Sequence, residues 1–165
     1  MIEPGYVLTM AEYNAEMNRR VYGAAARLPD AERRADRGVF WASIHGTLSH
    51  VLWADEMWLS RFAGWGRPAG KHGGSDRHVE DFSDLRLRRE AFDADLLGWA
   101  RALRPEDLAG DLVWRSGLME REMSTPRAIC VIHLFNHQTH HRGQVHALLT
   151  RAGEDTGATD LPFIL

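Results

Sequence analysis

The residues with the clearest capacity for chemistry lie near the C-terminal end, where HLFNHQTHHRGQVHALL, residues 133–149, carries five of the nine histidines. At helical spacing this segment forms a stripe that is apolar at both ends and rich in imidazoles in the middle. The stripe contains Ile129, Cys130, His133, Leu134, His137, His140, His141, Gln144, Ala147 and Leu148. Buried imidazoles need a hydrogen-bond partner or a metal ion. We therefore expect this stripe to face the interior, with Gln138, Thr139, Arg142 and His146 on the opposite side.

A metal ion could be held by two of these histidines. His137 and His141 are four residues apart, about 6 Å along a helix axis, so their ring nitrogens can converge on one ion. His133 with His137 has the same spacing, and His140 with His137 is separated by three residues. Spacing does not choose among these pairs, and a third ligand must come from another segment.

Three neighbours of the histidines have simpler interpretations. Gln144 follows His141 by less than one turn, which predicts a hydrogen bond to a metal ligand, a substrate contact or an ordinary interhelical hydrogen bond. Gly143 is expected to permit close helix approach, and Arg142 to pair with an acidic neighbour. Cys130 lies about 10 Å along the axis from His137, too far to share its ion, and is expected to be a small buried hydrophobe.

The rest of the chain must position these residues, and its periodicity predicts four amphipathic helices. The first begins at Thr9, whose spacing from Glu12 matches a capping box, and ends at Pro29. The second spans about residues 40–62 and the third about residues 83–103. The fourth runs to about residue 152 with Thr125 as N-cap. A short β-hairpin is expected within residues 106–123, so the predicted fold is an all-α four-helix bundle with this hairpin between helices 3 and 4.

Polar residues on the apolar faces need an explanation. Asp55 falls near the centre of the second helix's face and is expected to be buried and partnered. His50 lies on a flank of that face, whereas His45 and His133 are interpreted as hydrogen-bonded core rings. The neighbours of His50 are expected either to line a pocket or to be plain core. These neighbours are Trp53, Met57 and Trp58.

The connections are less informative. Residues 64–81 are rich in glycine and proline and predict a long surface loop. Its Trp65, His72 and His78 could reach a substrate, but a solvated connection is the favoured interpretation. The last residues are expected to dock on the body or on a partner chain, which favours a homodimer. The apolar ones are Leu161, Phe163, Ile164 and Leu165.

Composition limits the function classes. A chain of 165 residues with 44% hydrophobic content suits one domain over residues 1–165. The net charge of −3, with both signs interspersed, indicates neither a nucleic-acid nor an anionic-membrane surface. No apolar run approaches the roughly 20 residues that cross a bilayer. The single cysteine excludes an intramolecular disulfide, and we expect a cytoplasmic protein.

Two segments resemble the DinB family of four-helix-bundle proteins, which is related to the YfiT-like group. They are SIHGTLSHVLWADEMWLSRFAG, residues 43–64, and HLFNHQTHHRGQVHALL, in which NHQTHHRGQ is the more specific motif. An element at Tyr13, Asn14 and residues 18–20 extends the resemblance over nearly the whole chain. In that family, a histidine of the second helix and an HxxxH pair of the fourth bind one divalent metal.

The resemblance implies a ligand set and a range of activities. By position, His50 matches the second-helix ligand, while His137 and His141 match the HxxxH pair. The implied metal is nickel or zinc, with coordination positions open to water or an unknown small-molecule substrate. Thiol-dependent S-transfer, using a low-molecular-weight thiol, and hydrolysis are the implied reactions. A stress or interaction protein with a purely structural ion is the alternative.

Overall fold

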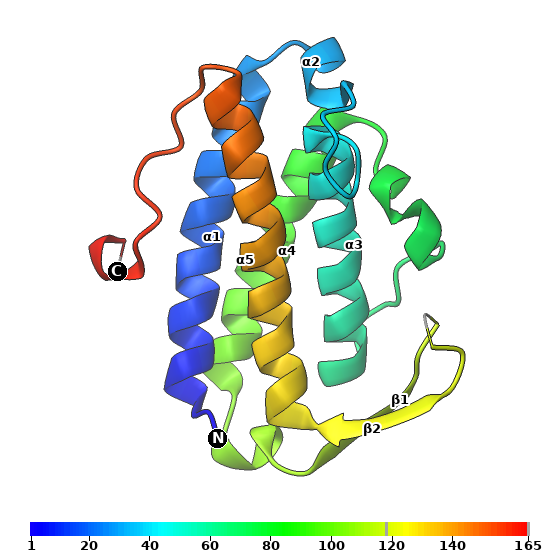
Figure 1. The fold of residues 1–165 in the computed structure, drawn as a ribbon. Coiled ribbons are helices and arrows are strands. Elements are labelled where there is room, and N and C mark those ends of the chain that lie inside the picture. The colour runs from blue at the N-terminus through cyan, green and yellow to red at the C-terminus, as the bar shows by residue number, and fades with distance from the viewer. Residues whose placement is uncertain (118, 165) are drawn as a thin grey trace.

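Four long helices dominate the computed structural model, which describes residues 1–117 and 119–164 (Figure 1). In these residues, α1 spans Pro4–Arg27, α3 spans Ile44–Phe62, α4 spans Phe82–Ala102 and α5 spans Arg127–Arg151. A five-residue helix, α2, spans Asp30–Arg34. Leu118, expected in the hairpin, and Leu165, expected in the apolar tail, lie outside the described residues. The predicted four-helix bundle is confirmed.

Helix α5 packs against two of the other long helices. α5 packs against α3 on one side and α1 on another, and α1 also packs along α4. The core between them is formed by buried aliphatic and aromatic side chains, among them Leu52, Leu96, Leu134, Phe135 and Leu149. Because α5 is buried on two sides, the residues of the stripe predicted from the sequence form only part of its buried surface.

The first helix begins earlier than the sequence predicts. α1 starts at Pro4, where the ring of proline fixes φ at a helical value, and Thr9 lies inside the helix. Val7 and Ala11 are buried, so the apolar face extends upstream of the apparent capping box. The predicted N-cap at Thr9 is therefore wrong.

The second long helix begins later than expected, at Ile44. Ser43 is its N-cap, and the Ser43 hydroxyl accepts a hydrogen bond from the backbone N–H of Gly46 at 3.0 Å. The residues before Ser43 form a tight turn in which Ala42 has a φ of 61°. This turn places Trp41 outside the helix, folded back along it.

The predicted hairpin is present and sets the start of α5. Strand β1, Asp111–Arg115, pairs antiparallel with β2, Glu122–Pro126. Thr125 lies opposite Leu112 in this ladder, and Pro126 is the N-cap of α5. The predicted N-cap at Thr125 is wrong because pairing with β1 keeps that residue extended.

The glycine-rich connection is more ordered than a solvated loop. Residues 72–77 form a 3-10 helix that packs against α3, and Ser75 within it is buried. His78 bonds Glu56 of α3 at 2.8 Å, and Trp65 packs edge-on against Phe92. The interpretation of residues 64–81 as a purely solvated connection is therefore corrected.

A buried charged network joins three helices. Arg89 of α4 donates hydrogen bonds to Asp55 of α3 and Asp93 of α4, each at 2.6 Å. Asn18 of α1 donates to both carboxylate oxygens of Asp93. Asp55 is fully buried, as the sequence predicts, and Arg89 is its partner.

Among the described residues, no helix is both long enough and apolar enough to cross a membrane.

Candidate metal centre

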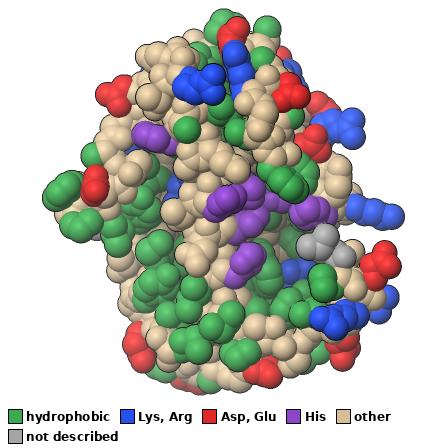
Figure 2. All heavy atoms as spheres, in the orientation of Figure 1, with side chains coloured by type: hydrophobic (Ala, Val, Ile, Leu, Met, Phe, Trp, Pro, Cys, Tyr) green, Lys and Arg blue, Asp and Glu red, His purple; other side chains and the backbone are tan. Residues whose placement is uncertain are grey.

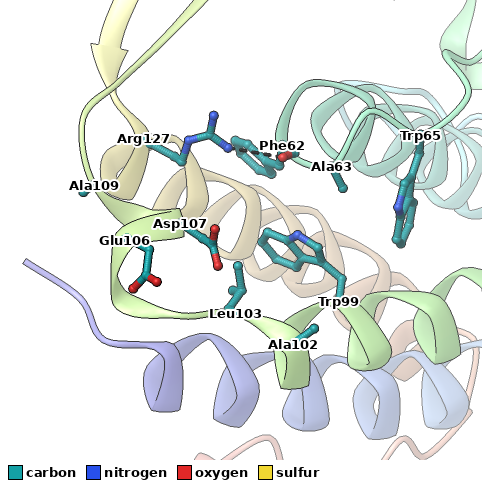
Figure 3. Close-up of a pocket in the computed structure, with 10 residues that line it drawn as sticks. All are labelled: Phe62, Ala63, Trp65, Trp99, Ala102, Leu103, Glu106, Asp107, Ala109 and Arg127. Carbon is teal, nitrogen blue, oxygen red and sulfur yellow. Dashed lines mark hydrogen bonds between the residues drawn. The ribbon is translucent and has the colours of Figure 1, made fainter.

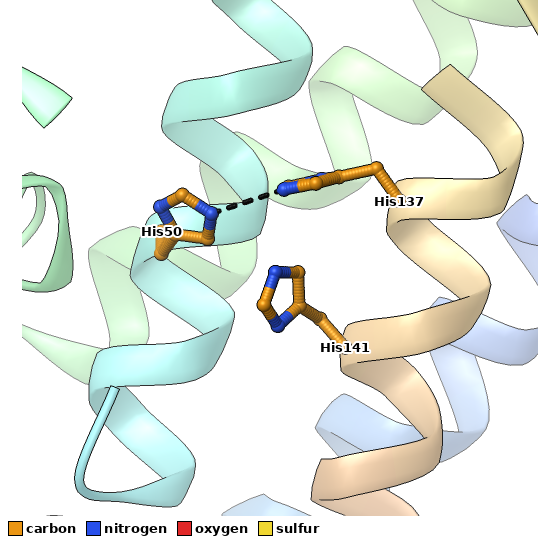
Figure 4. Close-up of side chains that lie close together, drawn as sticks. All are labelled: His50, His137 and His141. Atoms are coloured by element: carbon orange, nitrogen blue, oxygen red, sulfur yellow. Dashed lines mark hydrogen bonds between the residues drawn. The ribbon is translucent and has the colours of Figure 1, made fainter. Parts of the chain in front are cut away.

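Three histidines from two helices converge on one point. His50 lies on α3, and His137 and His141 lie one turn apart on α5 (Figure 4). Each offers one ring nitrogen, and these three atoms lie within 4.8 Å of one another. Cluster H denotes these three residues below. The positions selected by the resemblance are therefore the ones that the fold brings together.

The closest approach in cluster H joins two ring nitrogens. Nε2 of His50 lies 3.1 Å from Nε2 of His137 (Figure 4). Two nitrogens that each bind one ion at about 2.0–2.1 Å stand roughly 3 Å apart. The spacing of this pair is thus compatible with two ligands of one metal ion.

Contacts on the far side of two rings fix which nitrogen faces the centre. The Ser75 hydroxyl donates to the carbonyl of His72 at 2.6 Å, so Ser75 Oγ accepts from Nδ1 of His50 at 2.8 Å. Nδ1 of His141 donates to Oε1 of Gln144 at 2.8 Å. With Nδ1 protonated, the Nε2 atoms of both His50 and His141 carry free lone pairs.

The surroundings of cluster H keep its imidazoles neutral. Burial lowers the pKa of His50 to about 2, with further contributions from His137, His141 and His72. Burial and the adjacent His141 lower the pKa of His137 to about 3, and burial also lowers the pKa of His141. A divalent metal requires neutral imidazoles. Nδ1 of His137 is buried without a partner among the described residues, and this donor set fits a transition metal.

Aromatic residues cover the ring of His50. Trp41 stacks on it with ring centroids 4.1 Å apart and an interplanar angle of 25°. This contact depends on Gly46, because a Cβ there would lie 2.5 Å from the carbonyl oxygen of Trp41. His72, from the 3-10 helix, meets the same ring edge-on at 5.6 Å. Sequence reasoning did not place Trp41 or Ser75 at the site.

Cluster H borders a cavity of about 290 Å³. In Figure 2, histidine side chains gather midway along the visible face, with hydrophobic side chains below them. His50 and His137 line the cavity, and Trp53, Met57 and Trp58 form part of its wall. Of the two interpretations of these residues, pocket lining and plain core, the structure supports pocket lining.

The other histidines take different roles. His45 is buried and its Nε2 lies 2.8 Å from the carbonyl of Val79, as expected for a core ring. His133 is not a core ring, because it is exposed on the cavity wall against Trp58. His140 is exposed, with its Nε2 3.4 Å from Nε2 of Gln144.

The predicted outer side of α5 is partly wrong. Gln138 is fully buried and Arg142 is 5% exposed, because that side of α5 packs against α1. Arg142 hydrogen-bonds to Gln138 and Thr139 and not to an acidic side chain. A Cβ at Gly143 would meet nothing within 4 Å, so Gly143 does not mediate close helix approach.

A larger cavity of about 650 Å³ lies away from cluster H (Figure 3). It is lined by Trp65, Trp99 and Arg127, with Glu106 and Asp107 at one side (Figure 3). None of its lining residues among the described part of the chain is a histidine. Among the described residues, no group of three potential metal ligands converges at this cavity, so we assign the candidate site to the smaller cavity.

Comparison with known proteins supports the resemblance. The sequence matches the DinB family over residues 1–165. The chain belongs to the DinB family. It is 26% identical to Protein DinB of Bacillus subtilis (strain 168) over 168 residues, covering 97% of this chain and 94% of that protein.

A solved structure also shares the DinB-family fold. It is that of YfiT from Bacillus subtilis, described as a probable metal-dependent hydrolase with an unusual four-helix bundle topology. The TM-score is 0.66 at 12% sequence identity, and the match covers 94% of this chain and 92% of YfiT. At that identity the likeness supports the bundle architecture.

Proposed function

We propose that this DinB-family chain is a metal-dependent enzyme whose ion is held by His50, His137 and His141. The observation that carries the proposal is the convergence of three neutral imidazole nitrogens within 4.8 Å at the wall of a cavity. The proposed ion is divalent nickel or zinc, which imidazole nitrogens suit. Three protein ligands leave positions for water or substrate, as in catalytic sites.

When bound, a divalent ion supplies Lewis acidity, which lowers the pKa of a coordinated water or thiol and polarises a carbonyl oxygen. The chain's own residues orient the centre. Ser75 and Gln144 hold the rings of His50 and His141 through their Nδ1 atoms. Trp41 and the 3-10 helix cover His50 from solvent, while the cavity leaves one side of cluster H accessible.

Two reaction classes fit this arrangement. Hydrolysis is proposed first, because YfiT, which shares the fold, is described as a probable metal-dependent hydrolase. S-transfer with a low-molecular-weight thiol is the second class. A cytoplasmic location and a homodimer remain predictions.

The test is turnover by zinc-loaded and nickel-loaded protein. Panels of esters, amides and lactones test hydrolysis, and low-molecular-weight thiols paired with an electrophile test S-transfer. We expect metal-dependent product formation that is lost in His141→Ala and kept in His146→Ala, since His146 is bonded to Thr156 away from cluster H. If bound metal raises the melting temperature while neither panel gives turnover, the enzyme proposal fails and a structural ion is supported.

A further inference from the structure

The cavity beside cluster H contains a guanidinium without an acidic partner. Among the described residues, Arg61 forms no ion pair and no hydrogen bond, and its side chain lies over the ring of Trp58 at 4.6 Å. Trp114 of β1 lies 5.6 Å from the same guanidinium. Arg88 of α4, by contrast, pairs with Glu56 at 2.7 Å. Arg61 thus has unused hydrogen-bonding capacity at the cavity beside cluster H.

The surroundings of Arg61 are unfavourable to its charge in the absence of a ligand. Arg61 is half-buried, and burial followed by the nearby positive charge of Arg67 lowers its pKa. A desolvated cation without a carboxylate partner is costly, and an anionic ligand would offset that cost. One face of the guanidinium is covered by Trp58, but the N–H groups at its edge can still donate.

Arg61 lines the same cavity as cluster H but lies at a distance from it along α3. His50 and Arg61 are about three turns apart on α3, roughly 16 Å of axial rise. Helical side chains point back toward the N-terminus, and Arg61 does so by lying over Trp58. The guanidinium therefore lies closer to the histidines than its Cα does. Ala54 and Met57 line the cavity between the two ends, which makes the middle apolar.

We propose that this cavity accepts an elongated, mainly apolar small molecule with a carboxylate at one end, and that Arg61 selects for that carboxylate. The inference rests on the proposed function in one respect, because it places the reacting end of the molecule at cluster H. A planar monoanion suits a single guanidinium, which can pair with both carboxylate oxygens through two parallel hydrogen bonds. Trp58 and Trp114 would contact the apolar part.

The test compares 4-phenylbutyrate with its neutral amide as probes. Dissociation constants are measured by titration calorimetry for the wild type, Arg61→Gln, Arg61→Lys and the control Arg67→Gln. Arg67 carries the same charge but does not line this cavity. Each protein is studied in zinc-loaded and metal-free forms, and circular dichroism verifies that each variant is folded.

We expect the wild type and Arg67→Gln to bind the acid about tenfold or more tightly than the amide, in line with a hydrogen bond to a charged group. Arg61→Gln should bind both probes alike, with amide affinity unchanged, and Arg61→Lys should be intermediate because it keeps the charge without the planar fork. An acid preference that survives in Arg61→Gln would overturn the proposal. The proposal would also be overturned if the wild type preferred the acid only in its zinc-loaded form, or if the wild type did not bind the acid.

The metal-free arm separates this inference from the proposed function. If the preference for the acid depends on Arg61 in metal-free protein, the role of Arg61 holds even where the metal assignment fails. Loss of zinc binding in cluster H variants is measured independently of either probe.

Discussion

At the scale of single residues, the candidate site depends on side chains that hold the imidazoles in place. Gln144 accepts the Nδ1 hydrogen of His141, and Ser75 accepts that of His50. Each contact fixes the ring's tautomer and directs Nε2 to the centre of cluster H. The geometry of the proposed metal site is therefore set by five side chains, two of which would not be ligands.

Removing the Gln144 contact should weaken metal binding without removing a ligand. We expect Gln144→Ala to lower zinc affinity by about 10-fold to 100-fold, the usual cost of losing such a partner. Gln144→Glu keeps an acceptor at the same place and should retain affinity. The measurement is competition against a chromophoric zinc chelator.

His140→Ala is the matched control for Gln144→Ala. His140 is exposed, lies near Nε2 of Gln144, and packs edge-on against the ring of His141 without a hydrogen bond to its nitrogens. Its affinity should stay near that of the wild type. Equal affinities of Gln144→Ala and wild type would show that Gln144 does not orient His141.

At the scale of elements, α3 is positioned by its contacts with the turn before it and with α4. The turn at Trp41 approaches α3 so closely that residue 46 must lack a side chain. Further along α3, Asp55 joins the helix to α4 through Arg89. The N-terminal end of α3 is thus fixed by its close contact with the backbone of the preceding turn. The middle of α3 is fixed by the ion pair between Asp55 and Arg89.

Gly46→Ala tests the backbone approach. The added Cβ would lie 2.5 Å from the Trp41 carbonyl oxygen, so the turn must move and the stacking of Trp41 on His50 should be lost. We expect a destabilisation of about 1–3 kcal/mol in urea denaturation, as for overpacked sites, together with weaker zinc binding. Gly143→Ala, where the Cβ is unobstructed, should stabilise α5 by up to about 1 kcal/mol. Equal stability of Gly46→Ala and wild type would refute this role.

Asp55→Ala tests the charged connection. It leaves the buried Arg89 with Asp93 as its remaining carboxylate, so we expect a loss of about 3 kcal/mol or more in the free energy of unfolding. The exposed pair of Arg86 and Glu90, also on α4, provides the control. Glu90→Ala should change stability by less than about 1 kcal/mol. Similar losses in the free energy of unfolding for both variants would mean that the buried pair contributes no more to stability than the exposed pair.

At the scale of the whole molecule, the features that follow from regular spacing of apolar residues could be predicted from the sequence. The features that depend on contacts between distant segments could not. The four long helices, the hairpin and the burial of Asp55 follow from apolar spacing and turn residues. The helix starts at Thr9 and Thr125 were misplaced, because a proline and a strand partner decide those ends. Gln138 was misplaced because a single stripe cannot show that α5 packs on two neighbours.

The candidate site was predictable in part for the same reason. The HxxxH spacing is visible on one helix, and the family resemblance selected His50 and His141 over the rival pairs. The contributions of Trp41, Ser75 and Arg61 arise where the chain folds back on α3 or lies along the cavity, and such contacts leave no periodic signal in the sequence.

The most direct test of the central claim is the metal content of untagged protein, purified without added metal and measured by mass spectrometry. The proposed site predicts about one equivalent of a single transition metal in the wild type and in His146→Ala. His50→Ala, His137→Ala and His141→Ala should each contain much less. Full occupancy in His141→Ala, or no metal in the wild type even after reconstitution with nickel or zinc, would contradict a metal centre at cluster H.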